Sequence, residues 1–511
     1  MRKKNAILGT LFGILYQIVA IILTFAVRTI FIQNLSADYL GVNALFSDIF
    51  GILIALDCGI SSSVFIRIYK PLADGETERV KSVFALIRLV YRIRALAVFV
   101  VGFAIYFFLP VLAKKTVIPL EYIQALYVVY LILCSLNYTV IFYTFFLDTV
   151  QKRYISVCIQ MVVQIVQSVT SIVCLIVFKS FTIYMVINLL SEIAKSLVCR
   201  QYGMTKYPYL KGRLKIQDED KKDFKSLIGM AFHSMSNVIV RYTDSLLITS
   251  FVGLSMNGIY SNYKMIVDKI NSLINQMTMS IKDPMRNLMA EGDKEKVKGM
   301  VDRLSFLYFW ICGFCSVSLI CLLNPFITLC WGEEYVIGIV PIVLTVITMY
   351  LPILNYTIND AYYYSECYLN DKKTPILEII INLSISFIFG RKIGLTGIIL
   401  GTVVCYVFQT IRRASRLYSK YFKISVMGYV GHWLEYNVVI LGSTVVTYYL
   451  IQAVKLNHLF GQFVLQVIIC VLIPNVLFFL LYFHTKRFEY FKEMLLVLMR
   501  KITRKKTEEG K

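Results

Sequence analysis

The chain has 511 residues, of which 58% are hydrophobic and only 16% are charged. Soluble domains carry about 25% charged residues, so this composition excludes a soluble enzyme. The formal net charge of +22 would suit a nucleic-acid partner. The Lys and Arg residues instead gather in alternate loops between apolar runs, which is the positive-inside pattern of membrane proteins. We therefore expect a lipid bilayer, and no nucleic acid, around this chain.

Repeated apolar runs of about twenty residues predict an all-α polytopic membrane protein with about fourteen transmembrane helices. An even number of spans places both termini on one side, and the basic N-terminus makes that side the cytoplasm. Of the 53 Lys and Arg residues, 42 then lie in cytoplasmic segments and six in outer ones, as expected for a multi-pass protein of the cell (inner or plasma) membrane. The predicted spans are about 7–32, 39–66, 95–113, 121–147, 154–178, 181–199, 226–252, 257–281, 304–331, 336–366, 375–390, 394–411, 428–454 and 458–483.

Two charged segments of the chain resemble each other. Residues 73–81 read ADGETERVK and residues 290–298 read AEGDKEKVK, at an offset of 217 that also pairs Gly41 with Gly258. Both segments lie on the predicted cytoplasmic side, so they predict two six-helix lobes related by a parallel repeat. Chance similarity between short Lys/Glu loops is the alternative. The predicted domains are an N-terminal lobe (1–200), a basic cytoplasmic linker (201–225), a C-terminal lobe (226–423), two extra helices (424–484) and a basic cytoplasmic tail (485–511).

Ionisable side chains inside the predicted spans each cost about 2.5–3.5 kcal/mol to insert, so each needs a partner or a wet cavity. Most lie in spans 1, 2, 7 and 8, which are equivalent in the two repeats, so we expect them to line the space between the lobes. Guanidinium forks suit pyrophosphate oxygens, and Tyr and Asn side chains suit sugars. The candidates for holding a diphosphate are Arg28, Arg241, Lys264 and Lys269, and the candidate acidic, polar or ion-coupling residues are Asp48, Asp57, Asp244, Asp268, Asn355, Asn359 and Asp360.

A structural role is the alternative for several of these charges. Arg241 and Asp244 are three residues apart, so each can neutralise the other on one helix. Lys264 and Asp268, four residues apart, allow the same pairing. Arg28 has no acid near it within its own span, and its alternative is to extend its guanidinium outward to the membrane surface.

No motif of a soluble enzyme occurs in the sequence. There is no Walker A motif, so ATP is not expected to drive the protein directly. There is also no Gly-x-Ser-x-Gly nucleophile motif and no paired-His metal motif. We therefore expect a transporter that is not an enzyme and that has no cofactor and no metal.

Segments around the second predicted span are similar to a known family. Residues 39–46 read YLGVNALF, residues 56–60 read LDCGI and residues 69–73 read YKPLA, while residues 331–335 read WGEEY after span 9. These segments resemble the Wzx-type polysaccharide flippases of the multidrug/oligosaccharidyl-lipid/polysaccharide exporter superfamily. The resemblance implies translocation of an undecaprenyl-diphosphate-linked oligosaccharide from the cytoplasmic to the outer leaflet, through a cavity between two six-helix lobes. In such proteins basic cavity residues would hold the diphosphate.

The resemblance also implies partners and leaves alternatives open. It implies a lipid-linked oligosaccharide as substrate, Na⁺ or H⁺ as the coupling ion, and a polysaccharide polymerase and glycosyltransferases of the same pathway as partners. A lipid II (peptidoglycan precursor) flippase is one alternative function. A multidrug cation antiporter of the same superfamily is another. It would favour an acidic cavity for organic cations, and the basic excess of this chain, with 53 Lys and Arg against 31 Asp and Glu, argues against it. A membrane-embedded glycosyltransferase or polymerase would need a larger polar catalytic loop than this chain has.

Overall fold

The computed structural model describes most of the chain, and every regular element in the part that it describes is a helix. The described residues are 2–55, 65, 67–113, 116–150, 152–211, 216, 231–369, 371, 373–454, 456, 458–490 and 492. The chain divides into two compact units. The first comprises residues 1–262 and 375–398, and the second comprises residues 263–374 and 399–511.

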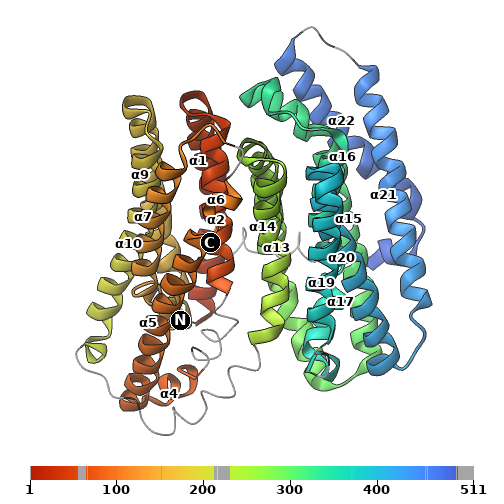
Figure 1. Ribbon diagram of the computed structural model, residues 1–511. Helices are drawn as coiled ribbons and strands as arrows, with labels where there is room; N and C mark the ends of the chain where they lie inside the picture. Colours follow the sequence, from red (N-terminus) through yellow and green to blue (C-terminus); the bar gives the residue numbers. More distant parts are fainter. Residues whose placement is uncertain are drawn as a thin grey trace, which may run out of the picture. The chain divides into compact units, whose positions relative to one another are not determined.

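In the first unit, α1 packs along α9, α9 packs on α10, and α5 packs on α7 (Figure 1). The helix α2 packs on α13, which brings the second predicted span against the seventh. The first turns of α14 and most of α19 complete this unit. Its helices are α1 (Arg2–Asn34), α2 (Ala37–Ala55), α4 (Tyr69–Asp74), α5 (Thr77–Tyr106), α6 (Leu109–Leu112), α7 (Leu120–Tyr138), α8 (Phe142–Thr149), α9 (Arg153–Phe178), α10 (Phe181–Lys206), η1 (Pro208–Leu210), α13 (Ala231–Phe251) and α19 (Lys373–Ile393). The helix α14 (Leu254–Glu291) belongs to this unit up to residue 262 and to the second unit from residue 263.

The second unit is built around α15, against which α16, α17, α21 and α22 pack. Aromatic side chains fill this core: the ring of Phe309 stacks on that of Tyr436 with centroids 4.3 Å apart, and Phe306 and Phe309 both contact Tyr482. The α21 and α22 helices therefore bury aromatic faces against α15. The helices of this unit are α15 (Lys294–Trp331), η2 (Glu333–Tyr335), α16 (Ile339–Leu354), α17 (Tyr356–Tyr364), α18 (Glu366–Leu369), α20 (Leu395–Arg416), η3 (Leu417–Phe422), α21 (Met427–Ala453) and α22 (Leu459–Tyr482).

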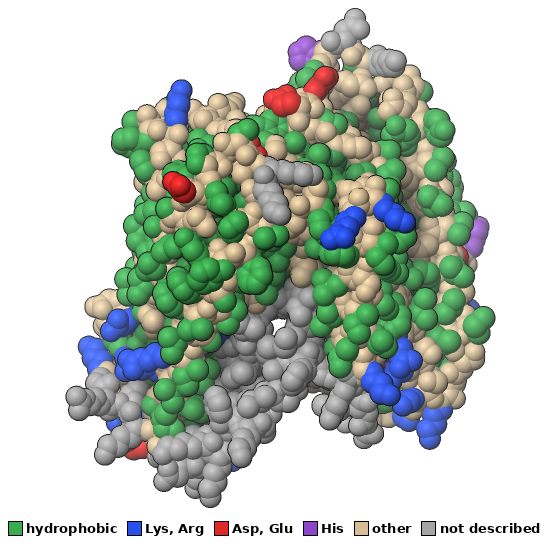
Figure 2. Space-filling model, in the orientation of Figure 1, with side chains coloured by type: hydrophobic (Ala, Val, Ile, Leu, Met, Phe, Trp, Pro, Cys, Tyr) green, Lys and Arg blue, Asp and Glu red, His purple; other side chains and the backbone are tan. Residues whose placement is uncertain are grey.

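Eight of the described helices are long and apolar enough to cross a membrane, or nine if the bent pair of α16 and α17 is one span. Large hydrophobic side chains are exposed along helices such as α5, α9, α21 and α22, and hydrophobic side chains cover much of the face drawn in Figure 2. A soluble protein rarely exposes so much apolar surface, so these helices face lipid. The predicted class of helical multi-pass membrane protein is confirmed, while the number of fourteen spans stays a prediction.

Helix boundaries differ from the predicted ones at several places. The predicted span 336–366 is broken: α16 and α17 meet at Asn355 with a bend of 47°. Pro352, inside the last turn of α16, has no N–H to donate to the preceding turn, which weakens the helix there. Elsewhere the helices are longer than the apolar runs, and α15 begins at Lys294 instead of about residue 304. The hydropathy pattern predicts only the part of a helix that meets lipid, so it misses the polar turns by which α15 extends beyond that part.

The two copies of the charged segment have the same local structure. Gly75 ends α4 and Gly292 follows α14, and both have a φ of 76°. The next helices begin at Thr77 and at Lys294, again 217 residues apart. A left-handed residue at the end of a helix is the position that glycine fills without strain. The repeated sequence therefore encodes a repeated helix–turn–helix.

The topology can be tested at these two turns. We expect cysteines placed at Gly75 and at Gly292 to escape a membrane-impermeant thiol reagent added outside intact cells, and to react after the cells are opened. Lys215 is also predicted to be cytoplasmic, but it lies outside the described residues. If both turns react from outside, the predicted orientation is wrong.

Candidate functional site

Arg28 joins α1 to the start of α14. Its Nε donates to Asn262 Oδ1 over 2.6 Å, and its Nη2 donates to the hydroxyl of Ser261. The Asn262 side chain is fully buried, and its Nδ2 has no hydrogen-bond partner among the described residues. Because Arg28 lies inside a candidate membrane span, its charge is costly unless such contacts stabilise it. A cation and an unsatisfied donor therefore lie side by side at this point of the first unit.

Arg241 and Asp244 lie on α13 of the same unit. The Asp244 side chain is 7% exposed, while Arg241 is exposed with its guanidinium 6.0 Å from the ring of Tyr242. These two positions leave both interpretations of Arg241 open, as a ligand for an anion or as the structural partner of Asp244.

A double substitution separates these interpretations. We expect Arg241→Gln combined with Asp244→Asn to abolish transport if Arg241 holds the substrate, because the phosphate then loses a charged donor. Protein abundance in the membrane, measured by immunoblot, should stay within about twofold of the parent, since removing both partners of a pair costs less than removing one. Normal transport by the double variant would make Arg241 structural.

The other predicted site residues are distributed over both units. Asp48 is half-buried on α2 of the first unit. The half-buried α14 residues of the second unit are Lys264, Asp268 and Lys269. Asp360, half-buried on α17, also belongs to the second unit. Asp57 lies outside the described residues. A single cavity that collects all the predicted residues stays a prediction.

Asn355 is the centre of a buried polar cluster in the second unit. Its Nδ2 donates to Thr410 Oγ1 over 2.8 Å and to the Leu351 carbonyl over 2.6 Å. The hydroxyl of Tyr429 donates to its Oδ1 over 2.6 Å. The amide thereby satisfies the backbone at the α16–α17 bend and links α20 and α21 to it. Part of its role is structural, which the sequence did not indicate.

Two further contacts involve Tyr and Asn side chains of the predicted span 336–366, the residue types expected to suit sugars. The hydroxyl of Tyr356 donates to Asn275 Oδ1 over 2.7 Å, and it lies 3.3 Å from Asn271 Oδ1. Asn359 Oδ1 accepts from Arg413 Nη1 over 3.1 Å. These amide and phenol groups are half-buried and offer donors and acceptors of the kind that sugar hydroxyls use.

A buried carboxylate that the sequence analysis missed stabilises the segment before α19. Asp371 is 1% exposed, and its Oδ1 lies 3.0 Å from Arg416 Nη1. Its Oδ2 accepts hydrogen bonds from the hydroxyls of Tyr362 and Thr374, each over 2.6 Å. Burial alone would raise the pKa of this carboxyl, but these hydrogen bonds and the Arg416 charge outweigh burial and lower it. An Asp shortly before a helix, where this residue is common, was the available signal in the sequence.

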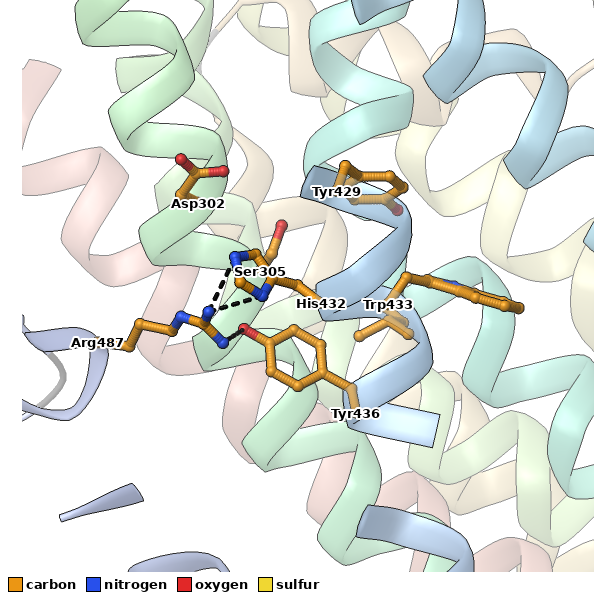
Figure 3. Close-up of a pocket in the computed structure, with 8 residues that line it drawn as sticks. Asp302, Ser305, Tyr429, His432, Trp433, Tyr436 and Arg487 are labelled. Carbon is orange, nitrogen blue, oxygen red and sulfur yellow. Dashed lines mark hydrogen bonds between the residues drawn. The ribbon is translucent and has the colours of Figure 1, made fainter. Parts of the chain in front are cut away.

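A cavity of about 200 Å³ lies in the second unit between α15, α21 and the segment after α22. Figure 3 shows Arg487 reaching toward His432 and Tyr436 of α21. Its Nη1 lies 3.2 Å from Glu435 Oε2, and its Nη2 lies 2.6 Å from His432 Nδ1. The guanidinium is therefore neutralised by a carboxylate of the protein and attaches the segment after α22 to α21. The remaining lining residues are Asp302, Ser305, Leu354, Tyr429 and Trp433.

Comparison with protein families gives one match. The sequence model of the family described as "Polysaccharide biosynthesis protein" matches residues 6–282, which is more than half of the chain. No curated protein sequence matches.

Solved structures share the fold at low sequence identity. The lipid II flippase MurJ in an inward closed conformation is 15% identical, with a TM-score of 0.65, over 93% of this chain and 99% of that chain. A multidrug resistance MATE family transporter in an inward-facing conformation is 16% identical, with a TM-score of 0.58, over 80% and 96%. A MOP superfamily transporter from Pyrococcus furiosus is 14% identical, with a TM-score of 0.53, over 82% and 96%. The transporter fold implied by the sequence resemblance is thus confirmed.

Proposed function

This chain belongs to the polysaccharide biosynthesis protein family, and we propose that it is a flippase for a lipid-linked oligosaccharide. The substrate is an undecaprenyl-diphosphate-linked repeat unit of a capsule, an O-antigen or a related surface polysaccharide. It moves from the cytoplasmic to the outer leaflet by alternating access. The family match over residues 6–282 is the observation that carries this proposal. It indicates polysaccharide biosynthesis as the process in which this chain, which has a transporter fold, takes part.

The chemistry of Arg28 supports an anionic head group as the substrate. A diphosphate offers several oxygens, and a guanidinium presents paired donors that match them. The Asn262 Nδ2, buried beside Arg28 without a partner among the described residues, adds a donor of the kind that a phosphate oxygen accepts. Arg241, Lys264 and Lys269 are the further basic candidates.

The amide and tyrosine groups of the second unit support a sugar-bearing substrate. Tyr356, Asn271 and Asn275 form one cluster, and Asn355 and Tyr429 form another. Aromatic rings stack on sugar faces and amides bond to sugar hydroxyls. In this proposal the half-buried Tyr356, Asn271 and Asn275 side chains contact the saccharide, while the arginine side chains hold the diphosphate. The buried Asn355 cluster supports the bend behind them.

A lipid II flippase is the second candidate function. The similarity to MurJ extends over 93% of this chain, compared with 80% for the MATE family transporter. The substrates of both flippase classes share a polyprenyl diphosphate and differ in the sugar. A multidrug cation antiporter fits less well, since the family that matches residues 6–282 is one of polysaccharide biosynthesis.

The cellular setting belongs to the same proposal. The protein lies in the cell membrane with both termini in the cytoplasm, where the glycosyltransferases that build the substrate work. A polymerase on the outer side receives the flipped repeat unit. A Na⁺ or H⁺ gradient drives the cycle, with Asp48, Asp244, Asp268 and Asp360 as the described candidates for ion coupling.

Depletion of the protein tests the function. We expect the lipid-linked oligosaccharide to accumulate on the inner leaflet, as measured by mass spectrometry of extracted lipids and by lectin access in inverted vesicles. Re-expression of the chain should remove it. Accumulation of lipid II instead would favour the second candidate, and loss of organic-cation efflux with normal lipid-linked saccharides would favour the antiporter.

A further inference from the structure

Two glycines allow α2 and α14 to cross at backbone contact. A Cβ atom built on Gly41 would lie 2.0 Å from the carbonyl oxygen of Leu254, and one built on Gly258 would lie 2.1 Å from that of Ala37. Real Cβ atoms never come so close to a backbone atom, so an alanine at either position forces the helices apart. Small residues at a crossing are the usual means of bringing membrane helices into contact.

The crossing is reciprocal. Ala37 and Leu254 are 217 residues apart, and so are Gly41 and Gly258. Gly41 thus contacts Leu254, which is the second-repeat equivalent of Ala37. Gly258, the second-repeat equivalent of Gly41, contacts Ala37 itself. Reciprocal contacts of this kind occur where a two-fold axis passes through a contact. The α2–α14 crossing therefore lies on the local axis that relates the two repeats.

The crossing lies at one end of the helices. Both glycines are in the first turns of α2 and α14, and the turns before these helices lie at the same end of the first unit (Figure 1). In the predicted topology this is the outer end. The side chains around it are closed to solvent, since Leu40, Val42 and Leu45 are each 0% exposed.

Arg28 fastens the same two repeats beside the crossing. It comes from α1 of the first repeat and donates to Ser261 and Asn262, which follow Gly258 on α14 of the second. In the proposed function, the same guanidinium N–H groups of Arg28 bind the diphosphate of the substrate. A phosphate that binds Arg28 must therefore compete with Ser261 and Asn262 for the guanidinium.

We propose that the Gly41/Gly258 crossing is the closed outer gate of the transport path, and that Arg28 is its latch, which a phosphate-bearing head group releases. The inference rests on the proposed flippase function. Ser261 and Asn262 are then positioning residues that hold Arg28 while the gate is closed. Substrate binding weakens the contact between the repeats at the outer end, which favours the state that opens there.

The gate can be tested without measuring transport. Leu45→Cys places a thiol one turn below Gly41, where it is buried while the gate is closed. Intact cells are treated with a membrane-impermeant maleimide, and modification of position 45 is quantified by peptide mass spectrometry. We expect Gly41→Ala and Gly258→Ala each to raise this modification about tenfold, which corresponds to a shift of about 1.4 kcal/mol toward the open state. Gly442→Ala on α21, where a Cβ meets nothing within 4 Å, is the matched control and should change nothing.

Two variants of the latch extend the test. Arg28→Ala should raise the modification of position 45. Asn262→Asp should lower it, because a carboxylate holds the guanidinium more tightly than an amide does. Asn262→Asp should also lower kcat for flipping more than it changes KM.

The outcomes distinguish the gate from the proposed function. Unchanged modification in both glycine variants, with normal amounts of protein in the membrane, would overturn the gate. Unchanged modification in Arg28→Ala and Asn262→Asp would overturn the latch. If the modification changes as expected but no lipid-linked oligosaccharide accumulates on depletion, the gate stands and the proposed substrate is wrong.

Discussion

Arg28→Ala is expected to abolish flipping while the protein remains folded in the membrane. Each hydrogen bond to a charged group contributes about 1.5–3 kcal/mol, so losing even one contact to the diphosphate lowers transport by roughly tenfold or more. Removal of a charge from a membrane span does not destabilise insertion. The measurement is outer-leaflet delivery of the lipid-linked oligosaccharide, normalised to protein in the membrane fraction.

Two comparisons sharpen this expectation. Arg28→Lys should restore part of the transport, because lysine keeps the charge and loses the planar fork of donors. Arg391→Ala is the matched control: Arg391 stacks on Phe387 of the same helix at 4.1 Å and has no part in the proposed site. Normal flipping by Arg28→Ala would assign the diphosphate to other residues, with Arg241 the first to examine.

Asp371→Asn is expected to have the largest effect on stability. The substitution leaves Arg416, whose side chain is 17% exposed, without its carboxylate partner. Breaking a buried ion pair from one side costs about 3–5 kcal/mol. A thermal or urea unfolding measurement on the purified protein should show this loss. Glu78→Gln is the control, because the Glu78 side chain is 77% exposed in its pair with Lys81 and such surface pairs contribute at most about 1 kcal/mol.

The same residue predicts a pH dependence. The pKa of Asp371 is lowered in the folded protein, so the folded state binds its proton less readily than the unfolded chain does. Its contribution to stability is then fully present above the ordinary carboxyl pKa of about 4, and it is lost as the pH falls through the folded value. The parent protein should lose stability in that acidic range, and Asp371→Asn should lose less. Identical pH profiles for the two proteins would contradict this role of Asp371.

The sequence predicted the class of fold because membrane insertion is governed by local composition. A run of apolar residues such as 154–178 must form a helix in lipid, where every backbone group needs an internal partner, and α9 spans Arg153–Phe178. The repeated turn was equally predictable, because Gly75 and Gly292 encode the same left-handed turn locally. The break at Asn355 was missed, since its cause combines Pro352 with amide contacts from distant helices.

The candidate site was only partly predictable. Sequence spacing singled out Arg28 as a charge inside a span and paired Gly41 with Gly258 as repeat positions. Neither observation indicated that the glycines touch the opposite repeat, or that Arg28 is bound by Ser261 and Asn262. Asp371 was not considered, because a single acid in a short polar loop has no sequence signature of burial.

The sequence by itself determined the helical class, the membrane environment, the repeated turn at Gly75 and Gly292 and the family. These properties depend on composition and on local repetition, which are written along the chain. Only the tertiary structure decided which side chains Arg28 contacts, which amides support a bend and which backbone atoms Gly41 and Gly258 approach. Those contacts join residues far apart in the chain, from 55 positions for Asn355 with Thr410 to 234 for Arg28 with Asn262. They depend on which helix faces pack together. A hydropathy pattern gives the same signal for an apolar face that meets lipid and for one that packs on another helix, so it does not predict these contacts.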